Sequence, residues 1–145
     1  MAKAVNAAAL RRKGAARVIG NAIARALGIK LVSVGAKQLR AEMRVTALHM
    51  NNAGRVNGGV LMAYGDVVGA AATVANLKPG ERTSTLESKT NFFAAGMGPV
   101  LKATVDRLHA GRTTMVWQTT IRNSDGSRVA IVTQTQIRLS AKPES

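Results

Sequence analysis

The sequence predicts a single α+β domain in which an antiparallel sheet packs against one long buried helix. Residues 58–75 are almost uncharged and of helical length, and the segments around them alternate apolar with polar residues as half-buried strands do. Turns that contain Gly or Pro separate those segments. Because consecutive strands joined by short turns pair antiparallel, the apolar helix is expected to cover one face of the sheet.

The first part of the chain is basic and is predicted to hold a tail and one short helix. Residues 1–14 lack the apolar region and cleavage site of a signal peptide, so a solvated basic tail is expected there. Over residues 15–27 apolar side chains recur at helical spacing, and Gly28 follows as a stop signal. This amphipathic helix is expected to pack on the domain itself rather than on a membrane or a partner.

Alternation with a period of two predicts the strands. It is clearest before the apolar segment, and the later strands are rich in Thr and Val. The single domain is expected over residues 15–140, with residues 141–145 as a C-terminal tail. The predicted strands span residues 37–47, 82–93, 100–110, 112–123 and 128–139.

The composition limits the class of ligand. Lys and Arg number 21 against seven Asp and Glu, and the formal net charge of +14 favours anions such as phosphate groups. Nucleic acid fits this charge, but no helix-turn-helix or zinc-finger spacing is visible and aromatic residues are only 3% of the chain, so no nucleic-acid partner is expected. The absence of Cys and the two scattered His predict no metal site and fit a cytoplasmic location.

Asp66 is the only charged residue between Arg55 and Lys78. A membrane span is not expected, because the segment is short, contains four Gly and carries this Asp at its middle. A carboxylate in an apolar segment is costly to desolvate and is usually kept for a partner or for chemistry. Gly65 and Gly69, four residues apart, are expected to let the helix lie close to the sheet.

The predicted start of the long helix is a second candidate site. Gly58 and Gly59 place unpaired backbone N–H groups where an anion or a polarised carbonyl oxygen is favoured. At a rise of ~1.5 Å per residue, Gly58 lies about 12 Å along the axis from Asp66, too far for both to act on one atom within one subunit.

Four motifs follow one another in a fixed order. They are Asn51 six residues before Asn57-Gly58-Gly59, Asp66 nine residues after Asn57, Thr85 with Asn91-Phe92, and Gly111-Arg112. Over about residues 27–139 this order resembles the hotdog-fold acyl-CoA thioesterases of the phenylacetic-acid-degradation group. The resemblance implies a hotdog fold, a strongly curved antiparallel sheet wrapped around a long central helix. It also implies an acyl-CoA substrate, no cofactor, and a homodimer or homotetramer.

The same resemblance implies roles for individual residues. Asp66 activates water or attacks the thioester, the Gly58 N–H polarises its carbonyl, and Asn51 orients the nucleophile or the substrate. Thr85 positions water, with Ser84 as the alternative. In the family Asp of one subunit faces the Gly-Gly turn of the other, which removes the 12 Å difficulty. The implied substrate contacts are Asn57, Gly59, Ser84 and Arg112, the last as a contact to CoA phosphate.

Asn57 departs from the family, which usually has His there. Asn can replace a His that caps the helix, because its side-chain oxygen accepts an N–H bond from the first turn. Hotdog dehydratases need a His as acid and base, and neither His49 nor His109 stands at that place, so a hydrolase is favoured. A non-catalytic protein that binds acyl-CoA is the competing hypothesis.

Each candidate also has a purely structural alternative. Asp66 could pair with an Arg or with backbone N–H groups, and Gly58 with Gly59 could serve only close packing. Asn51 and Arg112 could be ordinary turn residues.

Overall fold

The computed structural model describes the backbone of residues 2–140 and the side chains of residues 6–140. Six antiparallel strands form one sheet in the order β1-β2-β4-β5-β6-β3. The strands are β1 (Ile29–Val34), β2 (Gln38–Arg44), β3 (Arg82–Phe92), β4 (Val100–Ala110), β5 (Thr114–Arg122) and β6 (Arg128–Leu139). The helices are α1 (Ala2–Ile19), α2 (Ala22–Ala26) and α3 (Gly58–Val74), with a 3-10 turn η1 (Ala47–His49).

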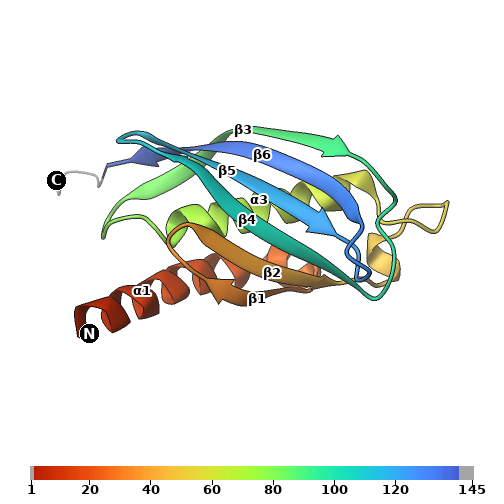
Figure 1. Ribbon diagram of the computed structural model, residues 1–145, viewed down its shortest axis with the longest axis horizontal. Coiled ribbons are helices and arrows are strands. Elements are labelled where there is room, and N and C mark those ends of the chain that lie inside the picture. The colour runs from red at the N-terminus through yellow and green to blue at the C-terminus, as the bar shows by residue number, and fades with distance from the viewer. Residues whose placement is uncertain (1, 141–145) are drawn as a thin grey trace.

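The long helix α3 lies on the concave face of the sheet, which curves around it (Figure 1). The predicted curved sheet around a central helix is therefore confirmed. A Cβ at Gly65 would lie 2.4 Å from Val132 Cγ2, and one at Gly69 would lie 2.3 Å from Gln134 Oε1. These two glycines let α3 approach β6 more closely than any side chain would allow.

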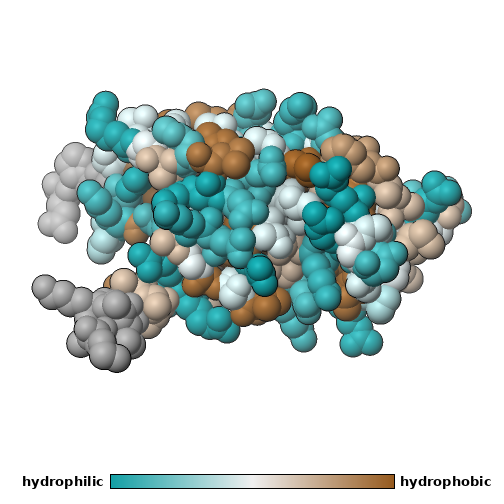
Figure 2. Space-filling model, viewed as in Figure 1, coloured by the Kyte–Doolittle hydropathy of each residue, from teal (hydrophilic) through white to brown (hydrophobic). Residues whose placement is uncertain are grey.

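Tyr64 anchors α3 to the opposite half of the sheet. Its buried hydroxyl donates to the carbonyl oxygens of Ala41 on β2 and Leu101 on β4, at 3.0 and 3.3 Å. Burial raises the pKa of this hydroxyl well above its usual range, so the group stays a neutral donor. Polar residues dominate the face of the molecule shown in Figure 2, as expected where a sheet meets water.

The basic N-terminal segment expected as a tail is helical from Ala2, and its side chains over residues 6–14 are exposed or half-buried. Ala is the strongest helix former, and small residues let α1 pack closely on the end of α3. Ala15 is fully buried, and a Cβ at Gly14 would lie 3.1 Å from the carbonyl oxygen of Val74. The tail predicted over residues 141–145 lies outside the described residues.

Two expectations for the N-terminal third need correction. The helix predicted over residues 15–27 is divided at Gly20, and Asn21 begins α2 by accepting the Ala24 N–H at 2.9 Å. Strand β1 was not predicted at all, because its exposed and buried positions do not alternate. Among the described residues, no helix is long and apolar enough to cross a membrane.

Candidate functional site

Asp66 lies on the side of α3 that faces β3 and β6. Its Oδ1 accepts the hydroxyl hydrogen of Thr85 at 3.0 Å and the amide of Gln134 at 3.4 Å. The second oxygen, Oδ2, has no hydrogen-bond partner within residues 6–140. Asp66 is half-buried, so this oxygen combines partial desolvation with access from outside. The structure thus brings together two of the predicted site residues, Asp66 and Thr85.

Ser84, the alternative to Thr85, is exposed and makes no contact with Asp66. Side chains alternate between the faces of a strand, so only one of two successive residues can face α3. Thr85 pairs in register with buried Gln136 and therefore shares its inward face. Within one subunit, it is therefore Thr85 and not Ser84 that donates its hydroxyl to Asp66.

The start of α3 presents a free backbone donor. Asn57 caps the helix, with Oδ1 accepting the Gly59 N–H at 2.8 Å, a contact of about 1 kcal/mol. Asn is thus a competent cap at this position, as expected. The N–H of Gly58, the first helical residue, has no acceptor in the described part of the chain. A Cβ at Gly58 would lie 3.4 Å from the Phe92 ring.

Asn51 organises the loop before α3. Its side-chain oxygen accepts the N–H groups of Ala53 and Arg55, at 2.9 and 3.1 Å. These two hydrogen bonds are those of an ordinary turn residue, which was the structural alternative for Asn51. Its amide nitrogen makes no hydrogen bond within residues 6–140 and is exposed, so a donor is still free there.

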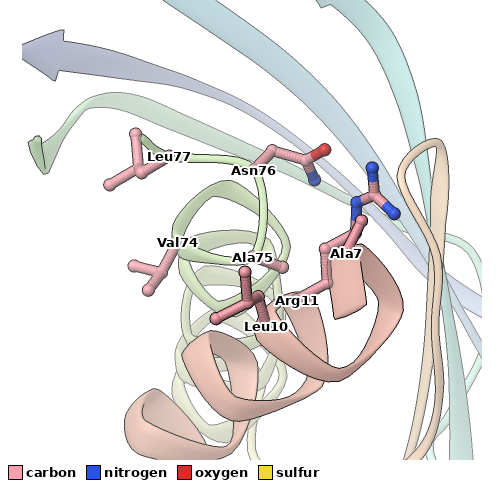
Figure 3. Close-up of a pocket in the computed structure, with 7 residues that line it drawn as sticks. All are labelled: Ala7, Leu10, Arg11, Val74, Ala75, Asn76 and Leu77. Atoms are coloured by element: carbon pink, nitrogen blue, oxygen red, sulfur yellow. The ribbon is translucent and has the colours of Figure 1, made fainter. Parts of the chain in front are cut away.

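The remaining predicted residues do not meet Asp66 within one subunit. Gly58 and Asp66 are on the same helix about 12 Å apart along its axis. Arg112 is exposed in the turn between β4 and β5. The hollow between α1 and the end of α3 contains none of the predicted site residues, as Figure 3 shows. Its lining residues are Ala7, Leu10, Arg11, Val74, Ala75, Asn76 and Leu77.

His49, one of the two scattered histidines, is buried at the end of η1. Its Nδ1 accepts the Thr46 N–H at 2.8 Å and its Nε2 donates to the Leu27 carbonyl oxygen at 3.0 Å. The ring therefore holds the neutral Nε2-protonated form and ties η1 to the end of α2. His49 supports the fold and is not part of the site.

Sequence reasoning missed two glutamines next to the site. Gln134 and Gln136 are at most 1% exposed and occupy inward positions of β6, where alternation predicts apolar residues. Gln134 reaches Asp66, and Gln136 donates to Thr85 Oγ1 at 2.7 Å. A polar residue at a predicted core position was the signal that could have identified both.

Comparison with known proteins shows the same fold in several thioesterases. The PaaI protein of Escherichia coli, from the phenylacetic acid degradation operon, matches with a TM-score of 0.84 and 26% identity over 92% of this chain and 96% of that one. A thioesterase of Haemophilus influenzae matches with a TM-score of 0.82 and 23% identity over 88% of this chain and 90% of that one. The predicted hotdog fold is confirmed by these matches.

Sequence comparison agrees with the fold. A 1,4-dihydroxy-2-naphthoyl-CoA hydrolase of Listeria monocytogenes is 26% identical over 92 residues, which are 63% of this chain and 75% of that protein. A sequence model described as the thioesterase superfamily matches residues 53–130, which include α3 and its cap, Asp66 and Thr85. The chain therefore belongs to the thioesterase superfamily.

Proposed function

We propose that this protein hydrolyses an acyl-CoA thioester to a free carboxylic acid and CoA. The observation that carries the proposal is the Asp66 carboxylate, with one oxygen held by Thr85 and the other open. A half-buried carboxylate with an open oxygen is suited to take a proton from water or to attack a carbonyl carbon. Membership of the thioesterase superfamily and the similarity to a CoA hydrolase support this reaction.

In the general-base form of the reaction, Asp66 Oδ2 takes a proton from water while the water oxygen attacks the thioester carbonyl carbon. The carbonyl oxygen becomes an oxyanion, which the free Gly58 N–H and the positive end of the α3 dipole stabilise. Collapse of this intermediate breaks the C–S bond, and the CoA sulfur leaves with a proton. In the alternative form the same oxygen attacks the carbonyl carbon, the C–S bond breaks and CoA leaves as a thiolate that takes a proton from solvent. Water then hydrolyses the acyl-aspartyl anhydride to the free acid and the Asp66 carboxylate.

Asp66 and Gly58 act together only if two subunits combine. Strand β3 is the open edge of the sheet and runs beside α3, with Thr85 at Asp66 and Phe92 at Gly58. If two copies of β3 pair antiparallel about a two-fold axis near Ser88, Thr85 of one lies opposite Phe92 of the partner subunit. That arrangement carries Asp66 towards Gly58 of the partner subunit, so we propose a homodimer as the active form.

The chemistry of CoA fits the charge of the chain. CoA carries several phosphate groups, and a net charge of +14 attracts them over long range. Exposed Arg112 is proposed as a phosphate contact, and the free Asn51 amide is proposed as a donor to substrate or water. The preferred acyl group is to be identified with a panel of acyl-CoA substrates.

The test is free-thiol release from short-chain, medium-chain, long-chain and aryl acyl-CoAs, with wild type beside Asp66→Asn. We expect Asp66→Asn to fold and to lose about 10³-fold or more in kcat. Asp106→Asn is the matched control, because Asp106 is also half-buried and also accepts an amide, from Gln38 at 2.7 Å, but lies on β4. It should keep wild-type activity.

Three outcomes would contradict the proposal. If wild type binds acyl-CoA without releasing thiol from any ester, the protein is a binding module rather than a hydrolase. If Asp66→Asn turns over at the wild-type rate, Asp66 does not carry the chemistry. Salt-sensitive retention on DNA without affinity for CoA esters would favour nucleic-acid binding instead.

A further inference from the structure

Two buried amides stand behind the carboxylate that the proposed mechanism uses. Gln134 and Gln136 are 1% and 0% exposed, and both lie on β6, which packs against α3. An amide transferred from water into a protein interior is unfavourable unless hydrogen bonds replace those to water. Gln136 has a hydrogen-bond contact at both its amide oxygen and its amide nitrogen, and these contacts indicate its role.

Gln136 links two threonines on β3. Its Nε2 donates to Thr85 Oγ1 at 2.7 Å, and its Oε1 lies 3.0 Å from the Thr83 hydroxyl. That hydroxyl is also 2.7 Å from the carbonyl oxygen of Ile137 and shares its one hydrogen between the two acceptors. Thr85 in turn donates to Asp66 Oδ1 at 3.0 Å. The result is a directed series of hydrogen bonds from Thr83 through Gln136 and Thr85 to the carboxylate.

The direction of this hydrogen-bond series follows from the orientation of the Gln136 amide and from the one hydrogen on each threonine hydroxyl. A threonine hydroxyl has one hydrogen to donate. Because Gln136 supplies the hydrogen between it and Thr85, the hydrogen of Thr85 is available for Asp66. If the amide were reversed, Gln136 Oε1 would take that hydrogen, and Thr85 Oγ1 would face Asp66 Oδ1 as a second acceptor. That arrangement suits only a protonated Asp66.

We propose that Gln136 is a positioning residue that commits the Thr85 hydroxyl to Asp66 and thereby favours the carboxylate form that the reaction uses. This inference rests on the proposed function of Asp66. Gln136 does not touch the reacting atoms and acts through Thr85. Gln134 supports the same carboxylate oxygen more weakly, at 3.4 Å.

On β3 and β6, no described side chain that faces this carboxylate is titratable. The register of β3 and β6 places polar uncharged residues opposite α3 at this point, and Asp66 is the only charged residue of α3. The residues on those two strands are Thr83, Thr85, Ser88, Gln134 and Gln136. A change in the pH profile of a Gln136 variant therefore reports on the hydrogen-bond series itself.

The test compares Gln136→Leu with Gln136→Met, which both remove the two polar atoms without adding a titratable group. Each should lower kcat about tenfold or more with KM within about twofold, the size expected for one hydrogen bond to a charged group. The acidic limb of the kcat pH profile should move upward, because the carboxylate loses a favourable hydrogen bond. A purely structural residue would not move this limb.

Two further variants guard against misfolding and unspecific effects. Thr83→Val removes the hydroxyl that fixes Gln136 Oε1 from a half-buried position, and it should shift the same limb in the same direction by less. Thr119→Val is the matched control, because Thr119 is fully buried on β5 and its hydroxyl has no partner within the described side chains. Its kcat and pH profile should be those of wild type.

Wild-type kcat and pH profile in folded Gln136→Leu, Gln136→Met and Thr83→Val would overturn the inference. If Asp66→Asn is inactive in the same experiment, the proposed function stands while the role of Gln136 falls. If Asp66→Asn is fully active, both fall together, since Gln136 then has no catalytic carboxylate to position.

Discussion

The two edges of the sheet differ in length, cover and chemistry. Strand β1 at one edge has six residues, a bulge after Leu31, and contacts with α1 and α2. Strand β3 at the other edge has 11 residues, is exposed at most positions, and is flanked only by β6 and α3 (Figure 1). The covered edge carries no predicted site residue, whereas the open edge carries Thr85 in contact with Asp66.

This contrast indicates that the open edge serves assembly as well as catalysis. A long exposed edge strand is a template for pairing with another chain, and proteins usually shorten, twist or cover such strands. The chain shortens and covers β1, whereas β3 stays long and uncovered, although both strands carry a bulge. Leu86 and Phe92 add exposed apolar side chains to β3, at 59% and 52%. An active site that needs a second subunit is a physical reason to leave that edge open.

A charge placed on the open edge strand β3 should prevent its pairing with a second subunit, and this change should have the largest effect on activity. We expect Leu86→Asp to convert the proposed dimer to a monomer and to lower kcat/KM about 100-fold or more, since pairing would bury an uncompensated carboxylate from each subunit in the β3 interface. Val32→Asp on β1 is the matched control, because Val32 is 51% exposed. It should change neither mass nor activity.

The measurement is light scattering after size-exclusion chromatography, with thiol release on the same fractions. A monomeric wild-type protein with full activity would contradict the assignment of function to this edge. So would a Leu86→Asp variant that stays dimeric and fully active.

A smaller change should sharpen the comparison without dissociating the subunits. Thr85→Val keeps the side-chain shape and removes the hydrogen bond to Asp66, so kcat should fall about tenfold while the oligomer is unchanged. Thr85→Ser keeps the hydroxyl and should restore most of the rate. Thr104→Val, on the outer face of β4, is the control and should behave as wild type. Equal kcat for Thr85→Val and wild type would show that this hydroxyl does not contribute.

Strong periodic signals made the central part of the fold predictable. The apolar segment of α3 and the alternation in the later strands each have one favourable interpretation, and Gly65 with Gly69 indicated the close approach to the sheet. The N-terminal third was harder to predict. Strand β1 lacks alternation, and α1 owes its order to packing of small residues such as Ala15 on α3 rather than to an amphipathic pattern.

Some residues of the candidate site were likewise predictable from the sequence, and others were not. Asp66 was visible because a lone charge in an apolar segment needs an explanation, and its contact with Thr85 agrees with the resemblance to the family. The roles of Gln134 and Gln136 depend on the register between β3 and β6, which local sequence does not determine when a bulge lies between Thr85 and Glu87. The relation of Asp66 to Gly58 depends on a second subunit, which a single sequence does not describe.

The central claim is that Asp66 of one subunit works with Gly58 of the partner subunit. Gly58→Pro is a suitable second variant, because it removes only the free N–H at the first helical position. Proline is tolerated there, and the preceding Asn57 already has the extended backbone, φ −61° and ψ 137°, that proline requires.

The most direct measurement is complementation between Asp66→Asn and Gly58→Pro, two variants expected to be inactive alone. After subunit exchange, each mixed dimer should hold one site with neither change. Half of the dimers are then mixed with one intact site of two, so about a quarter of the wild-type activity should return. A mixture of folded, exchanged subunits with no more activity than its two components would contradict the shared site.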